Sequence, residues 1–484
     1  MKQLPSLWVS CLPLVFLVAF ISCAVHVFGD ATLSGASQIS LLSATAVCLG
    51  LGLVLRLVTW RDVQFHISQK IGGIGEAVFV LLLIGALSGA WMVSGIVPMF
   101  IYYGMEVMNP QWFLITACLV CAMVSVMTGS SWTTIATMGV AIMGIGRAMG
   151  FSDGWIAGAI ISGAYFGDKV SPLSDTTVLA SSTVGVPLFT HIRYMMFTTI
   201  PTFLVALVIY LIVGLRHDGM DSTQIVLVQD ALQHTFHLSL WLFLVPVLTI
   251  LLIAKRVPSL VVLFLATLLG VVASILFQSE LLIQIAGDTF SGAAQIFRGA
   301  MIQVFGATDI DTGLSTLNDL VATRGMSGMM DTIWLILCAT LFGAAMTATR
   351  MVDSIIRSVL RLVRGTASLV ASSAFSGIFL NIVCADQYLS IVLTANMFHK
   401  LYQDSGHEDR LLSRTCEDSA TVTSVLIPWN TCGMTQSTVL GVSTLCYAPY
   451  CFFCYLSPLT TILVAALGWK IVRTPVCGQM NEMV

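Results

Sequence analysis

The chain has 484 residues, of which 57% are hydrophobic and 9% are charged, and its mean hydropathy is +0.94. A soluble protein carries roughly 25% charged residues, so this composition excludes a compact soluble enzyme. The formal net charge of −3 provides no basic surface for phosphate backbones, which excludes a nucleic-acid binder. The composition indicates an all-α polytopic membrane protein whose surroundings are the lipid bilayer.

Long apolar segments follow one another along the chain. A membrane helix needs about 20 apolar residues, and some of these segments are much longer, so they contain a break or a helix pair. We expect about 10–13 transmembrane elements. The first is an uncleaved helix near the N-terminus. Stretches without Asp, Glu, Lys or Arg cover 38–55, 77–105, 107–146, 194–215, 235–254, 257–279, 332–349, 365–385 and 419–469.

The distribution of Lys and Arg orients the chain. Lys2, Arg61, Lys70, Arg147 and Arg193 all fall on one side when the apolar segments are threaded across the membrane. The positive-inside rule makes that side the cytoplasm. We therefore expect a multi-pass protein of the cell inner (cytoplasmic) membrane with a cytoplasmic N-terminus.

The sequence divides into four segments, two of which have the layout of transport repeats. Because Arg147 and Arg193 fall on the same side, the chain between them must enter the membrane and return as a re-entrant hairpin. The segments are N-terminal membrane helices (1–105), a first transport repeat (106–215), connecting helices and loops (216–331) and a second repeat (332–484).

Polar residues interrupt both repeats at membrane depth. The first is broken at 129–134 and around the apex 167–177, and the second at 385–388 and 428–433. If the C-terminal end is cytoplasmic, the second repeat is inverted relative to the first. Paired interrupted segments in two oppositely oriented halves indicate the binding site of a secondary transporter.

Five carboxylates lie within or between the apolar segments of the repeats: Asp168, Asp175, Asp386, Glu417 and Asp418. An ionised side chain at the bilayer centre costs ~3 kcal/mol, and broken backbone at that depth must be buried or line a watery cavity. Na⁺ prefers several oxygen ligands, and the same carboxylates can carry protons, so Na⁺ and H⁺ compete. The neutral ligands that we expect beside them are Ser131, Ser171, Thr176, Thr421 and Asn430.

Each carboxylate also has a structural interpretation. Asp168 is placed to pair with Lys169 or Arg193, while Asp175 and Asp386 are placed to cap helix breaks. Glu417 and Asp418 are adjacent, so on a helix they point about 100° apart and only one is expected to face the site. For Ser131 the alternative is a small packing residue.

Several of these motifs resemble those of the NhaC family of bacterial sodium/proton antiporters. The resemblance implies the ion-transporter superfamily fold, with inverted repeats, re-entrant hairpins and a homodimer. It also implies that the five carboxylates handle ions. One departure is Thr394-Ala395-Asn396, where the family pattern has Pro-Gly-Arg, and the missing cation bears on any co-substrate. The matching motifs lie at 128–134, 165–177, 385–389, 417–419, 426–433 and 447–450.

These observations favour a secondary antiporter that exchanges Na⁺ for H⁺ by alternating access. We do not expect the protein to be an enzyme. Asp168, Asp175 and Asp386 are the expected Na⁺ ligands, and Asp175→Asn is expected to abolish exchange. We expect no cofactor besides the transported ions. The main alternative is a Na⁺/H⁺-linked antiporter of an organic anion, such as malate and lactate, or of an amino acid. A second alternative, an intramembrane serine protease, rests only on the string Gly325-Met326-Ser327-Gly328.

Overall fold

The computed structural model describes residues 4–28, 35–107, 109–216, 222–255, 257–314, 317–318, 321–361 and 363–471. Over these residues the chain folds into helices without a β-strand, and Thr308 and Thr323 form an isolated antiparallel bridge. The all-α prediction is therefore confirmed. Lys2, which contributed to the predicted orientation, lies outside the described residues.

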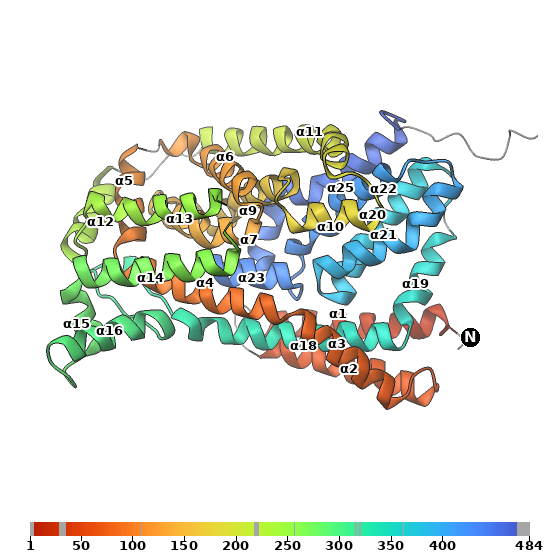
Figure 1. Ribbon diagram of the computed structural model, residues 1–484, viewed down its shortest axis with the longest axis horizontal. Helices are drawn as coiled ribbons and strands as arrows, with labels where there is room; N and C mark the ends of the chain where they lie inside the picture. The colour runs from red at the N-terminus through yellow and green to blue at the C-terminus, as the bar shows by residue number, and fades with distance from the viewer. Residues whose placement is uncertain are drawn as a thin grey trace, which may run out of the picture.

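The N-terminal part consists of five helices, and α18 packs with two of them. Figure 1 shows α1, α2, α3 and α18 together along one edge of the molecule. Contacts of α18 with both α2 and α3 tie this layer together. The helices are α1 (Leu7–Phe28), α2 (Ala36–Val54), α3 (Trp60–Gly73), α4 (Gly75–Val93), α5 (Ile96–Val107) and α18 (Met330–Ala348).

Two segments of the chain each contain helices that are interrupted by short breaks, and the remaining helices connect or flank them. The first segment has α6 (Pro110–Thr128), α7 (Ser131–Thr134), η2 (Ile135–Gly139), α8 (Val140–Ala148), α9 (Asp153–Val170), α10 (Asp175–Thr183) and α11 (Leu188–Leu215). The second has α20 (Thr366–Cys384), α21 (Gln387–Asp404), α22 (Asp409–Cys416), η5 (Glu417–Thr421), η6 (Ser424–Leu426), α23 (Thr431–Leu440), α24 (Thr444–Tyr447), η7 (Ala448–Tyr450) and α25 (Phe452–Ala466). The others are α12 (Ser222–Thr235), η3 (Leu240–Phe243), α13 (Leu244–Ala254), α14 (Ser259–Phe277), α15 (Ser279–Ala286), α16 (Ala293–Phe305), η4 (Gly325–Met329) and α19 (Met351–Leu360).

Helices long and apolar enough to cross a membrane confirm the polytopic prediction. Among the described residues there are seven, or up to ten if each bent helix pair is one span. Ten spans equal the lower limit of the predicted 10–13 transmembrane elements. One of the bent pairs joins α4 and α5 at 64°.

The first break of each segment is built in the same way. Helix α6 ends at Gly129 (φ 67°) and α20 ends at Ala385 (φ 55°), both in the left-handed region that stops a helix. The next residue in each case caps the following helix: Ser130 accepts the N–H of Thr133, and Asp386 accepts the N–H of Leu389. Capping side chains of this kind satisfy orphan N–H groups at a helix start.

The short helix that follows the second break of each segment packs against the other segment. Helix α10 from the first segment packs on α21 of the second, and α23 from the second packs on η2 and α8 of the first. In Figure 1, α10 (yellow) accordingly lies among the blue helices α20–α22. This reciprocal packing brings the breaks of the two segments together in the centre of the molecule.

Helix α9 packs closely against neighbours on two faces because it has glycines on both. A Cβ atom on Gly163 would lie 2.1 Å from the Cys118 carbonyl oxygen, and one on Gly167 would lie 2.4 Å from that of Ala122. On another face, a Cβ atom on Gly158 would lie 2.5 Å from the Tyr450 carbonyl oxygen. Small residues allow membrane helices to approach in this way, and they fix the position of the C-terminal end of α9.

Candidate ion-binding site

Asp168 lies near the C-terminal end of α9, where the two breaks of the first repeat meet. Its side chain is buried, and Oδ2 accepts hydrogen bonds from the Ser131 hydroxyl (2.7 Å) and the Ser131 N–H (3.2 Å). A Cβ atom on Gly129 would lie 2.6 Å from the Leu173 carbonyl carbon, so the two broken backbones touch. The structure thus brings the predicted residues Asp168 and Ser131 into direct contact.

Lys169, the next residue, points to the other repeat. Its ammonium group is fully buried and donates to Asp418 Oδ1 and, at 3.1 Å, to the Ser457 hydroxyl. The other oxygen of Asp418 accepts the Thr198 hydroxyl at 2.8 Å. The proposed pairing of Asp168 with Lys169 or Arg193 is therefore wrong, because Lys169 pairs with Asp418 and Arg193 is exposed.

Arg414 is a second buried cation beside Asp418, and the sequence analysis did not place it there. Its Nε lies 3.9 Å from Asp418 Oδ2, and its guanidinium stacks over the Tyr194 ring at 4.7 Å. Both partners of this ion pair are fully buried, and none of the three guanidinium nitrogens has a hydrogen-bond partner among the described residues. Arg414 on α22 and Asp418 on η5 are four residues apart, and this spacing is the sequence signal that could have suggested their pairing.

Glu417 and Asp418 are adjacent but have different surroundings. Asp418 is held by Lys169, Thr198 and Ser457, whereas both carboxyl oxygens of buried Glu417 lack a hydrogen-bond partner among the described residues. The charges of Asp168 and Lys169 act on Glu417.

The backbone turn that carries Glu417 is a π-helix, a type of turn frequent at functional sites. It ends at Thr421, whose hydroxyl is also buried and also lacks a hydrogen-bond partner in the described part of the chain. Asp168 and Ser131 thus supply oxygens at the break of the first segment and Glu417 and Thr421 supply oxygens at η5, and the charge of Asp168 acts on Glu417. Oxygens of these kinds are suitable ligands for Na⁺.

The remaining predicted residues of the first repeat shape the second break. The Ser171 hydroxyl donates to the Val126 carbonyl oxygen at 2.8 Å and accepts the Leu173 N–H at 3.2 Å. The Thr176 hydroxyl lies 3.0 Å from that of Ser174, the residue that caps α10. Asp175, the first residue of α10, is exposed and lies outside this hydrogen-bonded cluster.

In the second repeat, two predicted residues serve as helix caps. Asp386 accepts the Leu389 N–H at 2.8 Å, which is the capping arrangement expected as an alternative. Asn430 accepts the Cys432 N–H at 3.0 Å, and its amide donates to the Asn381 carbonyl oxygen at 3.1 Å. The Thr431 N–H donates to the Ala385 carbonyl oxygen at 2.9 Å, so the two breaks are joined.

Lys70 of α3 reaches the break at Asp386. Its ammonium nitrogen is buried and lies 3.0 Å from the position of a Cβ atom on Gly343, close to the C-terminal end of α20. Its charge acts on Asp386. Lys70 is one of the cations that oriented the chain, and it also contributes a positive charge beside a predicted ion-handling residue.

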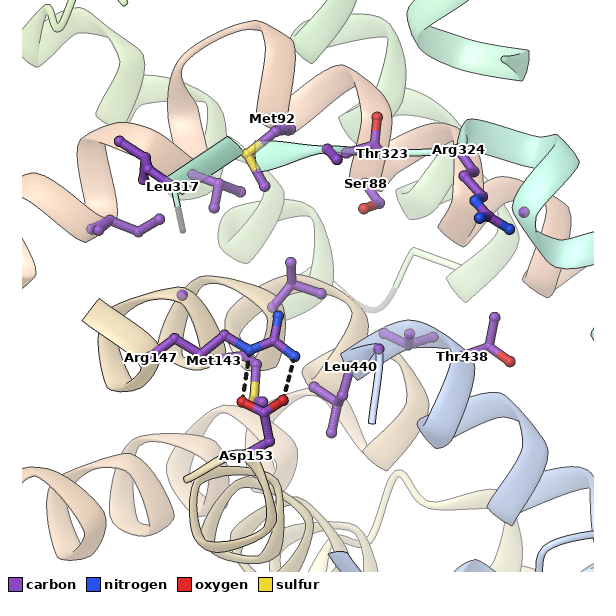
Figure 2. Close-up of a pocket in the computed structure, with 18 of the residues that line it drawn as sticks. Ser88, Met92, Met143, Arg147, Asp153, Leu317, Thr323, Arg324, Thr438 and Leu440 are labelled. Atoms are coloured by element: carbon purple, nitrogen blue, oxygen red, sulfur yellow. Dashed lines mark hydrogen bonds and ion pairs between the residues drawn. The ribbon is translucent and has the colours of Figure 1, made fainter. Parts of the chain in front are cut away.

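A cavity of about 920 Å³ lies between the N-terminal part and both repeats. Figure 2 shows that it is bounded by side chains from α4, α8, α23 and the segment before α18. At one side Arg147 donates to both carboxyl oxygens of Asp153, at 2.8 and 2.9 Å. Ser88, Thr438 and Arg324 also line it. The residues predicted to bind ions do not line this cavity.

The described residues contain no group of three or more His, Cys, Asp or Glu side chains that could hold a metal ion.

The chain is similar in sequence to known antiporters. Residues 163–469 match the family described as the Na⁺/H⁺ antiporter family. The chain is 36% identical over 435 residues to the Na⁺/H⁺ antiporter NhaC of Alkalihalophilus pseudofirmus, covering 89% of this chain and 90% of the relative. It is 32% identical to the malate-2H⁺/Na⁺-lactate antiporter of Bacillus subtilis, over 87% of each chain. It is also 33% identical to the arginine/ornithine antiporter ArcD of Halobacterium salinarum, over 92% of this chain and 93% of the relative.

Proposed function

This chain belongs to the Na⁺/H⁺ antiporter family that includes NhaC, and on that premise we propose that it exchanges Na⁺ for H⁺ across the cytoplasmic membrane. Family membership confirms the resemblance found in the sequence motifs. It also fits a multi-pass helical protein with polar breaks in its interior.

We assign the exchanged cation to Asp168, Ser131, Glu417 and Thr421. The observation that carries this assignment is the Glu417 carboxyl group, which is fully buried with neither oxygen partnered among the described residues. A buried carboxylate is costly unless a positive charge or a proton neutralises it. The Thr421 hydroxyl and the Asp168–Ser131 pair supply further oxygens from the adjoining break.

Exchange follows when Na⁺ and H⁺ neutralise the same carboxylates in turn. An empty, charged site crosses the low-dielectric interior at a high energetic cost, whereas a site occupied by either ion crosses readily. The cavity between the N-terminal part and the repeats provides room for the repeats to move. Asp175, exposed at the start of α10, is proposed as a residue that the cation meets on its way to the buried cluster.

The test uses purified protein in proteoliposomes that contain a pH-sensitive dye, with an imposed proton gradient and no organic solute. Addition of NaCl is expected to dissipate the gradient promptly, and choline chloride is expected not to. A gradient that persists after NaCl would contradict Na⁺/H⁺ exchange.

A second candidate function is exchange linked to an organic anion or an amino acid, as the names of two relatives suggest. An organic anion needs a free cationic partner. Lys169 is already bound to Asp418 and Ser457 and is not free for an anion, whereas the three guanidinium nitrogens of buried Arg414 have no hydrogen-bond partner among the described residues. If the proteoliposomes respond to Na⁺ only when malate, lactate or arginine is present, the second candidate replaces the first.

We also propose that the N-terminus is cytoplasmic and that the protein is a homodimer, on the basis of the Lys and Arg distribution and the family resemblance. Accessibility of single cysteines to a membrane-impermeant reagent tests the orientation. The mass of the protein in a nanodisc tests the dimer, and a mass of one chain contradicts it.

A further inference from the structure

Arg414 lies beside Asp418, the neighbour of Glu417, without making a hydrogen bond. It is among the largest fully buried side chains, and it touches Asp418 only at 3.9 Å while stacking on Tyr194. A fully buried cation is costly, and a well-formed ion pair is normally completed by several hydrogen bonds. Those bonds are missing here, since its three nitrogens have no hydrogen-bond partner among the described residues. Arg414 can therefore affect the neighbouring carboxylates only through its charge.

The charges around the site nearly cancel. Three buried carboxyl groups, Asp168, Glu417 and Asp418, share the centre of the molecule with two buried cations, Lys169 and Arg414. The titratable groups of α11 beside them are His191, which is hydrogen-bonded to the Ser413 hydroxyl at 2.8 Å, and Tyr194, whose hydroxyl donates to the Lys470 carbonyl oxygen at 2.9 Å, and both are counted as neutral. With all the carboxyl groups ionised, the cluster carries one negative charge, so a single monovalent cation or proton neutralises it.

We propose that Arg414 is the counter-charge that restricts this site to one monovalent cation and excludes divalent cations. The proposal rests on the proposed function, since it concerns the same cation site. A divalent ion would leave a net positive charge in a low-dielectric interior, where uncompensated charge is strongly disfavoured. Without Arg414 the empty cluster carries two negative charges, and a divalent cation then balances it.

The direct test replaces Arg414 by glutamine in the full-length protein and measures exchange in proteoliposomes. Removing a positive charge close to the site should strengthen cation binding, so R414Q is expected to lower the Na⁺ concentration for half-maximal exchange about tenfold. Its maximal rate should fall because Na⁺ is released more slowly. CaCl₂ or MgCl₂ should inhibit R414Q at concentrations that leave the wild type unaffected, and R414K should behave like the wild type.

Arg410 provides the matched control on the same helix. It lies one turn before Arg414, stacks over the same Tyr194 ring at 4.9 Å and pairs with Glu408, but it is partly exposed. R410Q therefore removes the same charge farther from the buried cluster, where solvent screens it. It is expected to leave both the Na⁺ dependence and the insensitivity to divalent cations unchanged.

A double variant restores the net charge of the cluster while Lys169 loses its carboxylate partner. R414Q combined with D418N removes one cation and one carboxylate, so the cluster regains a single negative charge. It is expected to recover the wild-type Na⁺ half-saturation and to lose inhibition by Ca²⁺, even if its maximal rate stays low. Size-exclusion profiles and melting temperatures identify any variant that fails to fold.

The outcomes distinguish this inference from the proposed function. A wild type without Na⁺/H⁺ exchange overturns the function itself. If the wild type exchanges but R414Q matches R410Q, or if the double variant matches R414Q, only the role of Arg414 is overturned. Inhibition of the wild type by Ca²⁺ at concentrations equal to those of Na⁺ also contradicts the proposal, and that measurement requires no variant.

Discussion

Lys169 and Asp418 are 249 positions apart in the sequence, and their side chains form a fully buried ion pair that joins the two repeats. Because of this ion pair, the neighbours Asp168 and Lys169 have different roles, and so do the neighbours Glu417 and Asp418. Lys169 neutralises Asp418, whereas Asp168 binds Ser131 and Glu417 has neither carboxyl oxygen partnered in the described part of the chain. One residue of each pair thus serves the connection between repeats, and the other is available to a cation.

Glutamine at 417 and asparagine at 418 are expected to have different effects. E417Q removes the uncompensated carboxylate, so we expect it to abolish Na⁺/H⁺ exchange with little change in melting temperature. D418N leaves Lys169 and Arg414 without their shared partner, and breaking one side of a buried ion pair costs about 3–5 kcal/mol. D418N should therefore be strongly destabilised. Melting curves and proteoliposome exchange rates check both, and a stable, inactive D418N with an active E417Q would reverse the assignment.

Ser130 and Ser131 provide a second pair of neighbours with separable roles. Ser131 donates its hydroxyl to Asp168, while Ser130 caps α7 by accepting the Thr133 N–H. S131A is expected to raise the Na⁺ concentration for half-maximal exchange. S130A is expected to lower stability by about 1 kcal/mol, which is typical for the loss of a cap, and to leave the Na⁺ dependence unchanged. Equal Na⁺ dependence in the two variants would exclude Ser131 as a ligand.

Much of the backbone architecture was predictable because helix breaks have local causes. Gly129 ends α6, and Asp386 and Asn430 cap the helices that follow their breaks. The sequence therefore located these interruptions within a few residues. It also identified Asp168 and Ser131, which the fold brings into contact.

The electrostatic partners could not be predicted, because they depend on which helices pack together. Arg414 lies in a short polar stretch that reads as a loop, yet α22 packs against α11 and buries it completely. Lys70 follows an apolar segment and reads as a cytoplasmic anchor, yet its ammonium nitrogen is buried near Asp386. Neither pairing leaves a periodic pattern in the sequence.

Close packing of α9 on α6 predicts a strong effect of a single methyl group. A Cβ atom on Gly163 would lie 2.1 Å from the Cys118 carbonyl oxygen, so G163A forces the two backbones apart. Overpacking of this kind costs about 1–3 kcal/mol, and it should also displace Asp168. Gly50 on α2 is the control, because nothing lies within 4 Å of its Cβ position. G50A should be neutral or slightly stabilising, and a melting temperature for G163A equal to that of G50A would contradict the tight crossing.

Substitution of Asp175 tests whether the cation passes this residue on its way to the buried site. It is exposed at the start of α10, apart from the hydrogen bonds around Asp168. The sequence-based prediction that D175N abolishes exchange remains a prediction, and the matched control is D153N, which removes a carboxylate paired with Arg147. Wild-type exchange in D175N would remove Asp175 from the cation's path. Loss of exchange in D175N, with activity retained in D153N, would support its assignment.

The cavity between the N-terminal part and the repeats predicts a variant that slows movement without altering binding. Ser88 of α4 lines the cavity opposite α8 and α23, as Figure 2 shows. S88W places a large side chain in this space, so if the repeats close the cavity during each cycle, the maximal exchange rate should fall severalfold. The Na⁺ half-saturation should not change, because the ion-binding residues lie elsewhere. L204W, at an exposed position of α11, adds the same bulk to the outer surface and should exchange at the wild-type rate. A wild-type rate in S88W would mean that the cavity keeps its shape while ions cross, and the movement would then have to be sought at the helix breaks themselves.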